Sequence, residues 1–212
     1  MHSAILQFRS NIERVRSLGG LYLALSRLTT PAVDATDILR AQIVLAVSAL
    51  DHYVHELTRL GMIEVFNGLR PPTNAFRRFQ VTIDAAMLGL TSSGGSSWFE
   101  EEIREKHGYL AFQHPDKITD AIRLFSSCEL WPSIASRFGL PVQDVKNRLQ
   151  LIVGRRNKIA HEADLDPSYT GTRWPISHSD AENTVKFIED LCEQIHSLVI
   201  IVEPSNQATR TD

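Results

Sequence analysis

The chain has 212 residues, of which 43% are hydrophobic and 22% are charged, with a net charge of −3 and an isoelectric point near 6.2. These values are typical of one soluble globular domain, and they exclude a strongly basic nucleic-acid-binding protein; any nucleic-acid binding must come from a local cluster of cations. The two cysteines are far apart and lack metal-ligand spacing. No segment reaches about 18 unbroken apolar residues, and the first residues lack the apolar core of a signal peptide. A cytoplasmic protein with no membrane span is therefore expected.

Two long helical patterns occupy the first third of the chain. Residues 3–28 repeat apolar side chains at helical spacing, with the glycine pair at 19–20 as a candidate break. A second helix begins at Asp34 or Thr36 and ends at the Asn-Gly pair at 67–68. Because this second helix is apolar on much of its circumference, we expect it to be the central buried helix.

The region 67–140 carries shorter helical patterns. We expect them at residues 73–90, 98–107, from His114 onward and at 131–138, with a Ser/Gly-rich loop at 91–97. The pattern at 98–107 contains four glutamates and is expected to be a solvated face.

A long helix is predicted from Pro141 to about Ala163, followed by a polar connection. The last helix begins with a capping box between Ser177 and Asp180, and the chain after Pro204 reads as a frayed tail.

Strand signals are scarce, so the predicted fold class is all-α, a helical bundle of about five main helices with shorter helices inserted. We expect a single domain over residues 1–203. It would comprise an N-terminal helical extension at 1–30 and a helical insertion region at 67–140, and a flexible tail would follow at 204–212.

An arginine interrupts the apolar stripe of the predicted helix 141–163. The stripe has one position missing, and that position holds Arg156; its apolar members are Val145, Leu149, Ile152, Ile159 and Ala163. A guanidinium is costly to bury without partners. Either the stripe ends there, or Arg156 points into a cavity where its charge is needed.

A polar face lies beside this stripe. Asn157 and His161 are four residues apart and therefore stack one above the other on a helix, and Gly154 lies on nearly the same line. A glycine inside a helix costs about 1 kcal/mol relative to alanine, which suggests close approach of a backbone or ligand, although a tolerated surface glycine stays open.

The stretch Arg156-Asn157-x-x-x-His161 resembles the R-x4–6-H motif of the HEPN domains. The surroundings are similar to the RiboL-PSP-HEPN subgroup, with an upstream helix like that at 49–57 and acids soon after the histidine, here Glu162 and Asp164. The resemblance covers roughly residues 34–203.

This resemblance implies a metal-independent endoribonuclease without a cofactor, which cleaves RNA by attack of the 2′-OH. Arg156 would clamp the phosphate, since arginine is always charged and binds phosphate oxygens bidentately. His161 would act as acid or base at neutral pH, and Asn157 would fix its ring or contact the phosphate. The resemblance also implies a homodimer, a role as a toxin or antiviral (abortive-infection) effector, and an antitoxin or regulatory protein partner.

Helix geometry leaves two ways to assemble this site. On an ideal helix Arg156 and His161 point about 140° apart. Either a local bulge or kink brings them together, or the two groups act across a dimer cleft, one from each chain.

Several residues have a second interpretation. Arg155 and Lys158 either add to an RNA-binding rim or form a solvated basic face. His52 and His55 lack the spacing of a zinc helix; His55 or Asp51 is expected to pair with a polar group of the central helices, near Arg156. For the whole chain, the alternative function is a catalytically inactive HEPN-like module that binds or scaffolds a nucleotide, RNA or protein partner.

Overall fold

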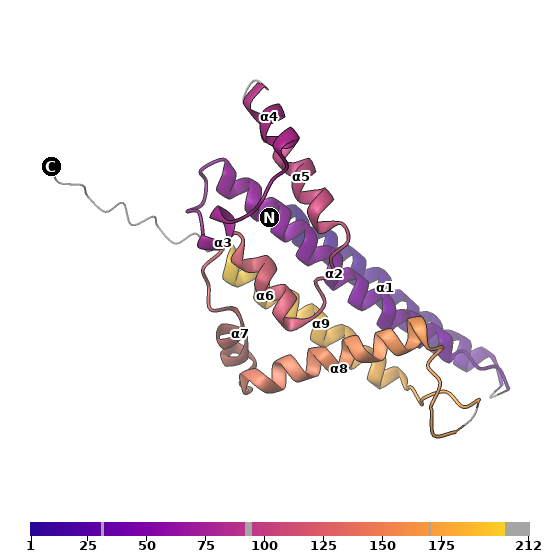
Figure 1. Cartoon of the computed structure of the whole chain (residues 1–212). Helices are drawn as coiled ribbons and strands as arrows, with labels where there is room; N and C mark the ends of the chain where they lie inside the picture. The colour runs from indigo at the N-terminus through magenta and orange to yellow at the C-terminus, as the bar shows by residue number, and fades with distance from the viewer. Residues whose placement is uncertain (31, 92–94, 170, 202–212) are drawn as a thin grey trace.

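The computed structural model describes residues 1–30, 32–91, 95–169 and 171–201, and in these residues the chain forms nine helices (Figure 1). They are α1 (His2–Leu28), α2 (Thr36–Phe66), α3 (Asn74–Arg77), α4 (Ile83–Thr91), α5 (Ser97–His107), α6 (Pro115–Arg123), α7 (Leu130–Phe138), α8 (Val142–His161) and α9 (His178–Val199). The described chain has one isolated β-bridge, between Leu165 and Arg173, and no longer strand. The predicted all-α fold class is therefore confirmed. The tail predicted at 204–212 and part of the loop at 91–97 lie outside the described residues.

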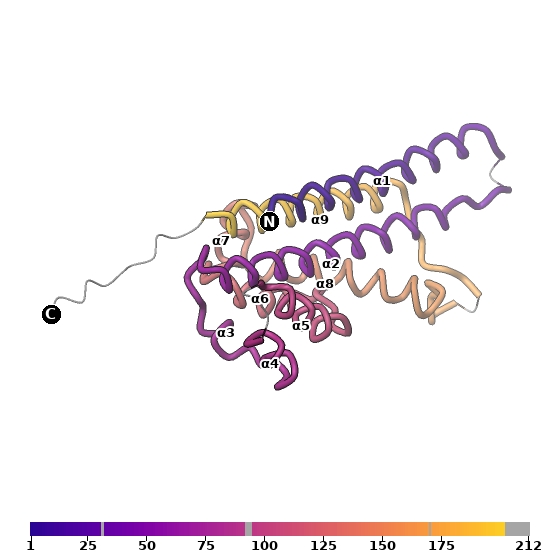
Figure 2. The backbone as a smooth tube through the Cα atoms, turned by 90° about the horizontal axis from the view of Figure 1, so that it is seen from above, coloured from indigo at the N-terminus to yellow at the C-terminus, as the bar shows by residue number. Residues whose placement is uncertain are grey.

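The central helix is α2, as the sequence predicts. Figure 2 shows α1 and α9 on one side of α2 and α8 on the other. Its Leu50, Tyr53 and Leu57 are fully buried, and the ring of Phe8 from α1 lies 5.2 Å from that of Tyr53. Burial of this apolar surface is the main force that holds the helices together. No described helix combines the length and the apolar character needed to cross a bilayer.

The first helix is continuous through its glycine pair, contrary to the suggested break. Gly19 is buried, and a Cβ atom added there would lie 2.8 Å from Oε1 of Glu182 and 3.0 Å from Nε2 of Gln42. The glycine therefore permits close packing of α1 against α2 and α9. Since α1 also contributes Phe8 and Ile12 to the core, it is an integral part of the bundle.

The pattern at 73–90 forms two helices instead of one. Thr73 caps α3 by accepting a hydrogen bond from the backbone N–H of Phe76 at 3.0 Å. The chain then leaves the helical conformation, and Glu102 of α5 accepts the N–H of Thr82 at 2.8 Å just before α4 begins. Glu102 is buried by this contact, so the prediction of a uniformly solvated glutamate face on α5 is wrong at that position.

The local start and stop signals elsewhere were predicted well. Asp34 accepts the N–H of Thr36 at the start of α2, and α7 ends at Gly139, whose φ of 64° lies in the left-handed region. The capping box of α9 is present: Ser177 accepts the N–H of Asp180, and the Asp180 carboxylate accepts the N–H of Ser177.

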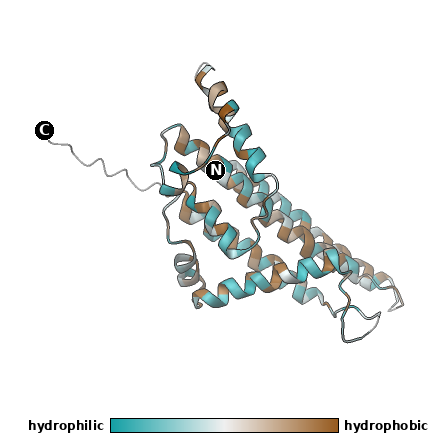
Figure 3. Ribbon diagram, in the orientation of Figure 1, coloured by the Kyte–Doolittle hydropathy of each residue, from teal (hydrophilic) through white to brown (hydrophobic). Residues whose placement is uncertain are grey.

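The helix α4 projects from the bundle and has no buried residue (Figure 1). Its apolar side chains face solvent: Ile83 is 79% exposed and Leu90 is 87% exposed. Figure 3 shows this apolar character at the tip of α4, whereas α8 is mainly hydrophilic along its length. The helix α8 packs on α2 at one face, and the rest of its surface is mainly polar apart from the exposed Leu151.

Candidate active site at the C-terminal end of α8

The helix α8 runs for 20 residues and ends close to the N-terminal half of α2. Pro141 is the N-cap of α8 and Val142 is its first helical residue, so the helix begins one residue later than predicted. Its last turn contains the basic residues Lys158 and His161. A positive charge is stabilising there because it lies at the negative end of the helix dipole. The helix ends at His161, two residues before the predicted end, and the N–H of Glu162 bonds to the carbonyl of Lys158 at 2.9 Å.

The apolar stripe of α8 packs on both sides of Arg156 as predicted, except that its last predicted member, Ala163, lies beyond the end of the helix and is exposed. Val145, Leu149 and Ile152 are buried in the main core. Ile159 packs against a second cluster formed by Leu39, Ile43 and Ala181. The stripe therefore does not end at Arg156 but continues beyond it.

Arg156 is partly buried in the gap of this stripe. Its Nη1 donates to Oδ1 of the neighbouring Asn157 at 3.0 Å. Its Nε is buried and has no hydrogen-bond partner among the described residues. A buried donor without a partner costs about 1–3 kcal/mol, and among the described residues no carboxylate neutralises this guanidinium.

His161 is exposed at the last position of α8, and in the described part of the chain it makes no hydrogen bond or ion pair. Asn157, one turn earlier, is exposed as well. Because α8 is an uninterrupted α-helix, no bulge brings Arg156 and His161 onto one face. Gly154 also faces open space, since an added Cβ would meet no atom within 4 Å. Within one chain, the close approach suggested for this glycine is therefore not present.

Arg155 points toward the protein instead of forming a solvated face. Its Nη2 donates to Oδ2 of Asp164 at 2.8 Å, to the carbonyl of Pro175 at 3.2 Å and to that of Trp174 at 3.3 Å. Burial lowers the pKa of the Arg155 guanidinium, and the nearby Asp164 carboxylate opposes that shift. One terminal nitrogen of Arg155 is therefore held inside the fold by an ion pair with Asp164, whereas Arg156 has no carboxylate partner among the described residues.

Lys158 lies beside the same segment. Its Nζ is 5.1 Å from the centroid of the Trp174 ring, a distance at which an ammonium group is attracted to the ring face. The residue as a whole is exposed, so its charge stays accessible at the surface.

Two residues of the α8 end were not recognised from the sequence. Arg40 of α2 is only 6% exposed and donates through Nε to Asp164 at 2.7 Å. A signal was available, because Arg40 is a charged residue within the apolar pattern of α2. Trp174, whose carbonyl accepts from both Arg40 and Arg155, carries no comparable signal.

The polar residues of α2 near its middle lie elsewhere. Asp51 accepts the N–H of Phe112 at 2.6 Å, and Nε2 of His55 lies 3.2 Å from the carbonyl of Leu110. His55 therefore contacts the segment between α5 and α6, and the predicted location near Arg156 is wrong. Among the described residues, no group of three or more His, Cys, Asp or Glu side chains is arranged to hold a metal ion.

Comparison with known proteins gives one match. The model of the RiboL-PSP-HEPN family matches residues 9–200, which include every helix from α2 to α9 and most of α1. The chain matches neither a curated protein nor a solved structure. Since the family match covers most of the chain and includes the Arg156–His161 motif, this protein belongs to the RiboL-PSP-HEPN family.

Proposed function

We propose that this protein is a metal-independent endoribonuclease whose active groups are Arg156 and His161. The observation that carries the proposal is that both groups are available to a ligand at the end of α8. Arg156 has no carboxylate partner and His161 has no partner at all within the described residues. Membership of the HEPN family, whose modules are often ribonucleases, supports the same chemistry.

The chemistry needs few protein groups because RNA carries its own nucleophile. A base removes the proton of the 2′-OH, a cation stabilises the charge on the phosphate, and an acid protonates the leaving 5′-oxygen. His161 fits the acid or base role, because histidine is the side chain most often used to donate or accept protons in catalysis and this ring is exposed. Arg156 fits the phosphate-binding role. Asn157 accepts a hydrogen bond from Arg156, which supports a role in orienting the guanidinium.

A complete site requires two copies of the chain in this proposal. Arg156 and His161 face different directions on a straight helix, so a homodimer would combine Arg156 of one chain with His161 of the other. A surface groove of ≈ 450 Å³ beside the end of α8 supports this arrangement. Its walls include Val44 and Leu45 of α2 and Ile159 of α8, which provide apolar surface for a second chain.

The decisive experiment mixes two inactive variants. Purified wild type should cleave single-stranded RNA but not DNA of the same sequence, and Arg156→Ala and His161→Ala should each be inactive. After mixing and subunit exchange, about a quarter of wild-type activity should return, because half of the dimers are mixed and each of these holds one intact pair. No recovery, with exchange verified, would contradict a site shared between chains. No cleavage by wild type would favour the non-catalytic binding module.

The biological role we propose is that of a toxin or antiviral effector, restrained by an antitoxin or regulatory partner. Unregulated cleavage of cellular RNA would arrest growth. Induced expression of wild type should therefore stop cell growth, whereas expression of His161→Ala at equal protein level should not. Equal growth of the two cultures, despite RNA cleavage by the purified protein, would argue against this role.

A further inference from the structure

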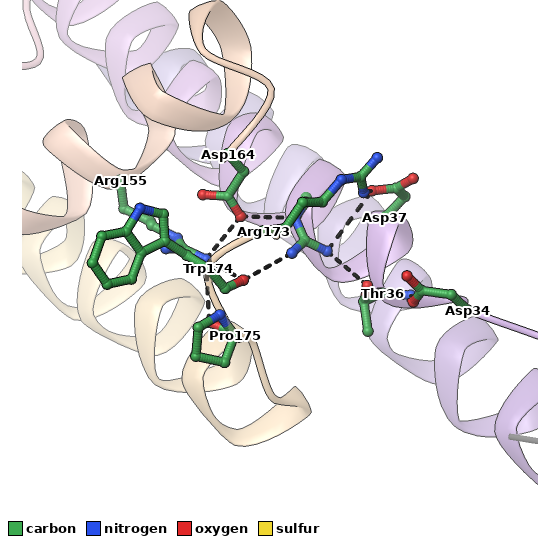
Figure 4. Close-up of polar contacts among 9 residues, drawn as sticks. Asp34, Thr36, Asp37, Arg155, Asp164, Arg173, Trp174 and Pro175 are labelled. Carbon is green, nitrogen blue, oxygen red and sulfur yellow. Dashed lines mark hydrogen bonds and ion pairs between the residues drawn. The ribbon is translucent and has the colours of Figure 1, made fainter. Parts of the chain in front are cut away.

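A buried carboxylate lies just beyond the end of α8. The side chain of Asp164 is fully buried, and its Oδ2 accepts Nε of Arg40 at 2.7 Å and Nη2 of Arg155 at 2.8 Å (Figure 4). Both guanidiniums also donate to the carbonyl of Trp174, at 2.9 Å and 3.3 Å. We name Arg40, Asp164 and Arg155 the Asp164 cluster. It joins α2, α8 and the connection between α8 and α9.

The backbone at this point is strained. Ala163 and Asp164 have φ values of 51° and 58°, in the left-handed region that residues with a Cβ rarely adopt, at a cost of about 1–2 kcal/mol each. Such conformations persist only where surrounding contacts hold them, and they concentrate at functional sites. Here the N–H of Asp164 bonds to the carbonyl of Lys158, and its own carbonyl accepts the N–H of Trp174. The last turn of α8, which ends at His161, is therefore held from both sides.

We infer that Asp164 is a positioning residue for His161, an inference that rests on the proposed ribonuclease function. The buried carboxylate keeps the two left-handed residues in place through Arg40 and Arg155. These residues reverse the chain directly after α8 and cap its last turn. His161 makes no contact of its own that would fix it, so its direction depends on this turn.

The test compares Asp164→Asn with wild type by RNA cleavage kinetics and by amide hydrogen exchange at the end of α8. We expect kcat to fall at least about tenfold, as it does when a reacting group is slightly displaced. KM should stay within about twofold, because Arg156 is retained to bind the phosphate. The N–H groups of Glu162 and Asp164, which bond to the carbonyl of Lys158, should exchange faster than in wild type. As a matched control, Glu193→Gln removes the charge that pairs with Arg9 on α1, and should change neither kcat nor the exchange of these two amides.

Unchanged kcat and unchanged exchange of the Glu162 and Asp164 amides in folded Asp164→Asn would overturn the inference. If this variant does not fold, Arg155→Lys replaces it: lysine keeps the positive charge but has a shorter side chain without the planar guanidinium, which should weaken the ion pair with Asp164, so kcat should again fall with KM preserved. Failure of the proposed function would be recognised separately, as absence of RNA cleavage by wild type. The exchange measurement needs no activity and would still decide whether Asp164 holds the end of α8 at His161.

Discussion

The arginines of this protein occupy two contrasting environments. At the seam between α1 and α9, Arg9 pairs with Glu193 through bonds of 2.7 and 2.8 Å, and Arg16 pairs with Glu189. Each arginine there has its own carboxylate, at the surface. At the C-terminal end of α8, two arginines share the single buried carboxylate of Asp164, and Arg156 has no carboxylate partner among the described residues.

This difference separates charge that stabilises the fold from charge that is available to a ligand. Exposed, balanced ion pairs contribute about 0–1 kcal/mol each. At the α8 end the guanidinium of Arg156 has no carboxylate partner among the described residues, and three buried polar atoms there lack hydrogen-bond partners: Nε of Arg156, Oδ1 of Asp164 and Nε1 of Trp174. An anionic group such as an RNA phosphate would meet the unpaired guanidinium there, which is the basis of the proposed function.

The largest expected effect comes from His161→Ala. Loss of the general acid or base should reduce RNA cleavage about a thousandfold. The melting temperature should not change, because His161 is exposed and without a partner. The exposed His52 of α2 provides a control: His52→Ala should cleave like wild type. Equal losses in the two variants would show that the effect is not specific to the α8 end.

The second largest effect should be a difference in stability between substitutions in the two regions. Arg40→Ala leaves the buried Asp164 with one guanidinium instead of two, and should destabilise the protein by about 3 kcal/mol. Arg9→Ala at the seam should cost less than about 1 kcal/mol. Urea denaturation of both variants measures these free energies of unfolding. Similar losses of unfolding free energy in the two variants would show that the buried pair of Arg40 and Asp164 stabilises the fold no more than the exposed pair of Arg9 and Glu193.

The third prediction separates activity from stability at one position. Arg156→Ala should reduce cleavage about a hundredfold through loss of a phosphate contact, without lowering the free energy of unfolding. The free energy of unfolding should not fall, because the buried Nε of Arg156 has no hydrogen-bond partner that the substitution would remove. Arg148→Ala, on the same helix but stacked on the Phe187 ring, should keep full activity. A marked loss of stability in Arg156→Ala would instead assign that arginine a structural role.

The smallest expected effect is the pH-dependent stability that the Arg9–Glu193 pair contributes at the seam between α1 and α9. The hydrogen bond from Arg9 lowers the pKa of Glu193. A lowered pKa in the folded state means that the stabilisation is present above the unfolded value of about 4.3 and is lost as the pH falls through the folded value. Glu193→Gln should therefore cost about 0.5 kcal/mol at pH 7, and nothing once Glu193 is protonated in both states. A cost that persists in acid would mean that the pair acts through packing instead of charge.

Features with local causes were predictable from the sequence. The capping box at Ser177, the stop at Gly139 and the start of α2 near Asp34 each depend on residues within a few positions. The interruption of the apolar stripe at Arg156 was also predictable, because a guanidinium in an apolar stripe is conspicuous at helical spacing. The assignment of Arg156 and His161 as active groups stays a proposal.

Features with distant causes were not predictable. The break between α3 and α4 depends on Glu102, which lies 20 residues beyond Thr82. The continuity of α1 through Gly19 depends on side chains from α2 and α9 that need the space. The inward position of Arg155 depends on Asp164, which two residues in the left-handed region turn toward the protein. The sequence gives no sign of this conformation, because alanine rarely adopts it. In each case a tertiary contact overrides the local preference.

The most direct test of the central claim is the chemistry of the product ends. RNA would be incubated with wild type in excess EDTA, with His161→Ala in parallel, and the ends of the fragments identified. We predict 2′,3′-cyclic phosphate ends from wild type alone, since attack by the 2′-OH needs no metal. Cleavage that stops in EDTA, or fragments that His161→Ala produces equally well, would contradict the assignment of the α8 end as a metal-independent ribonuclease site.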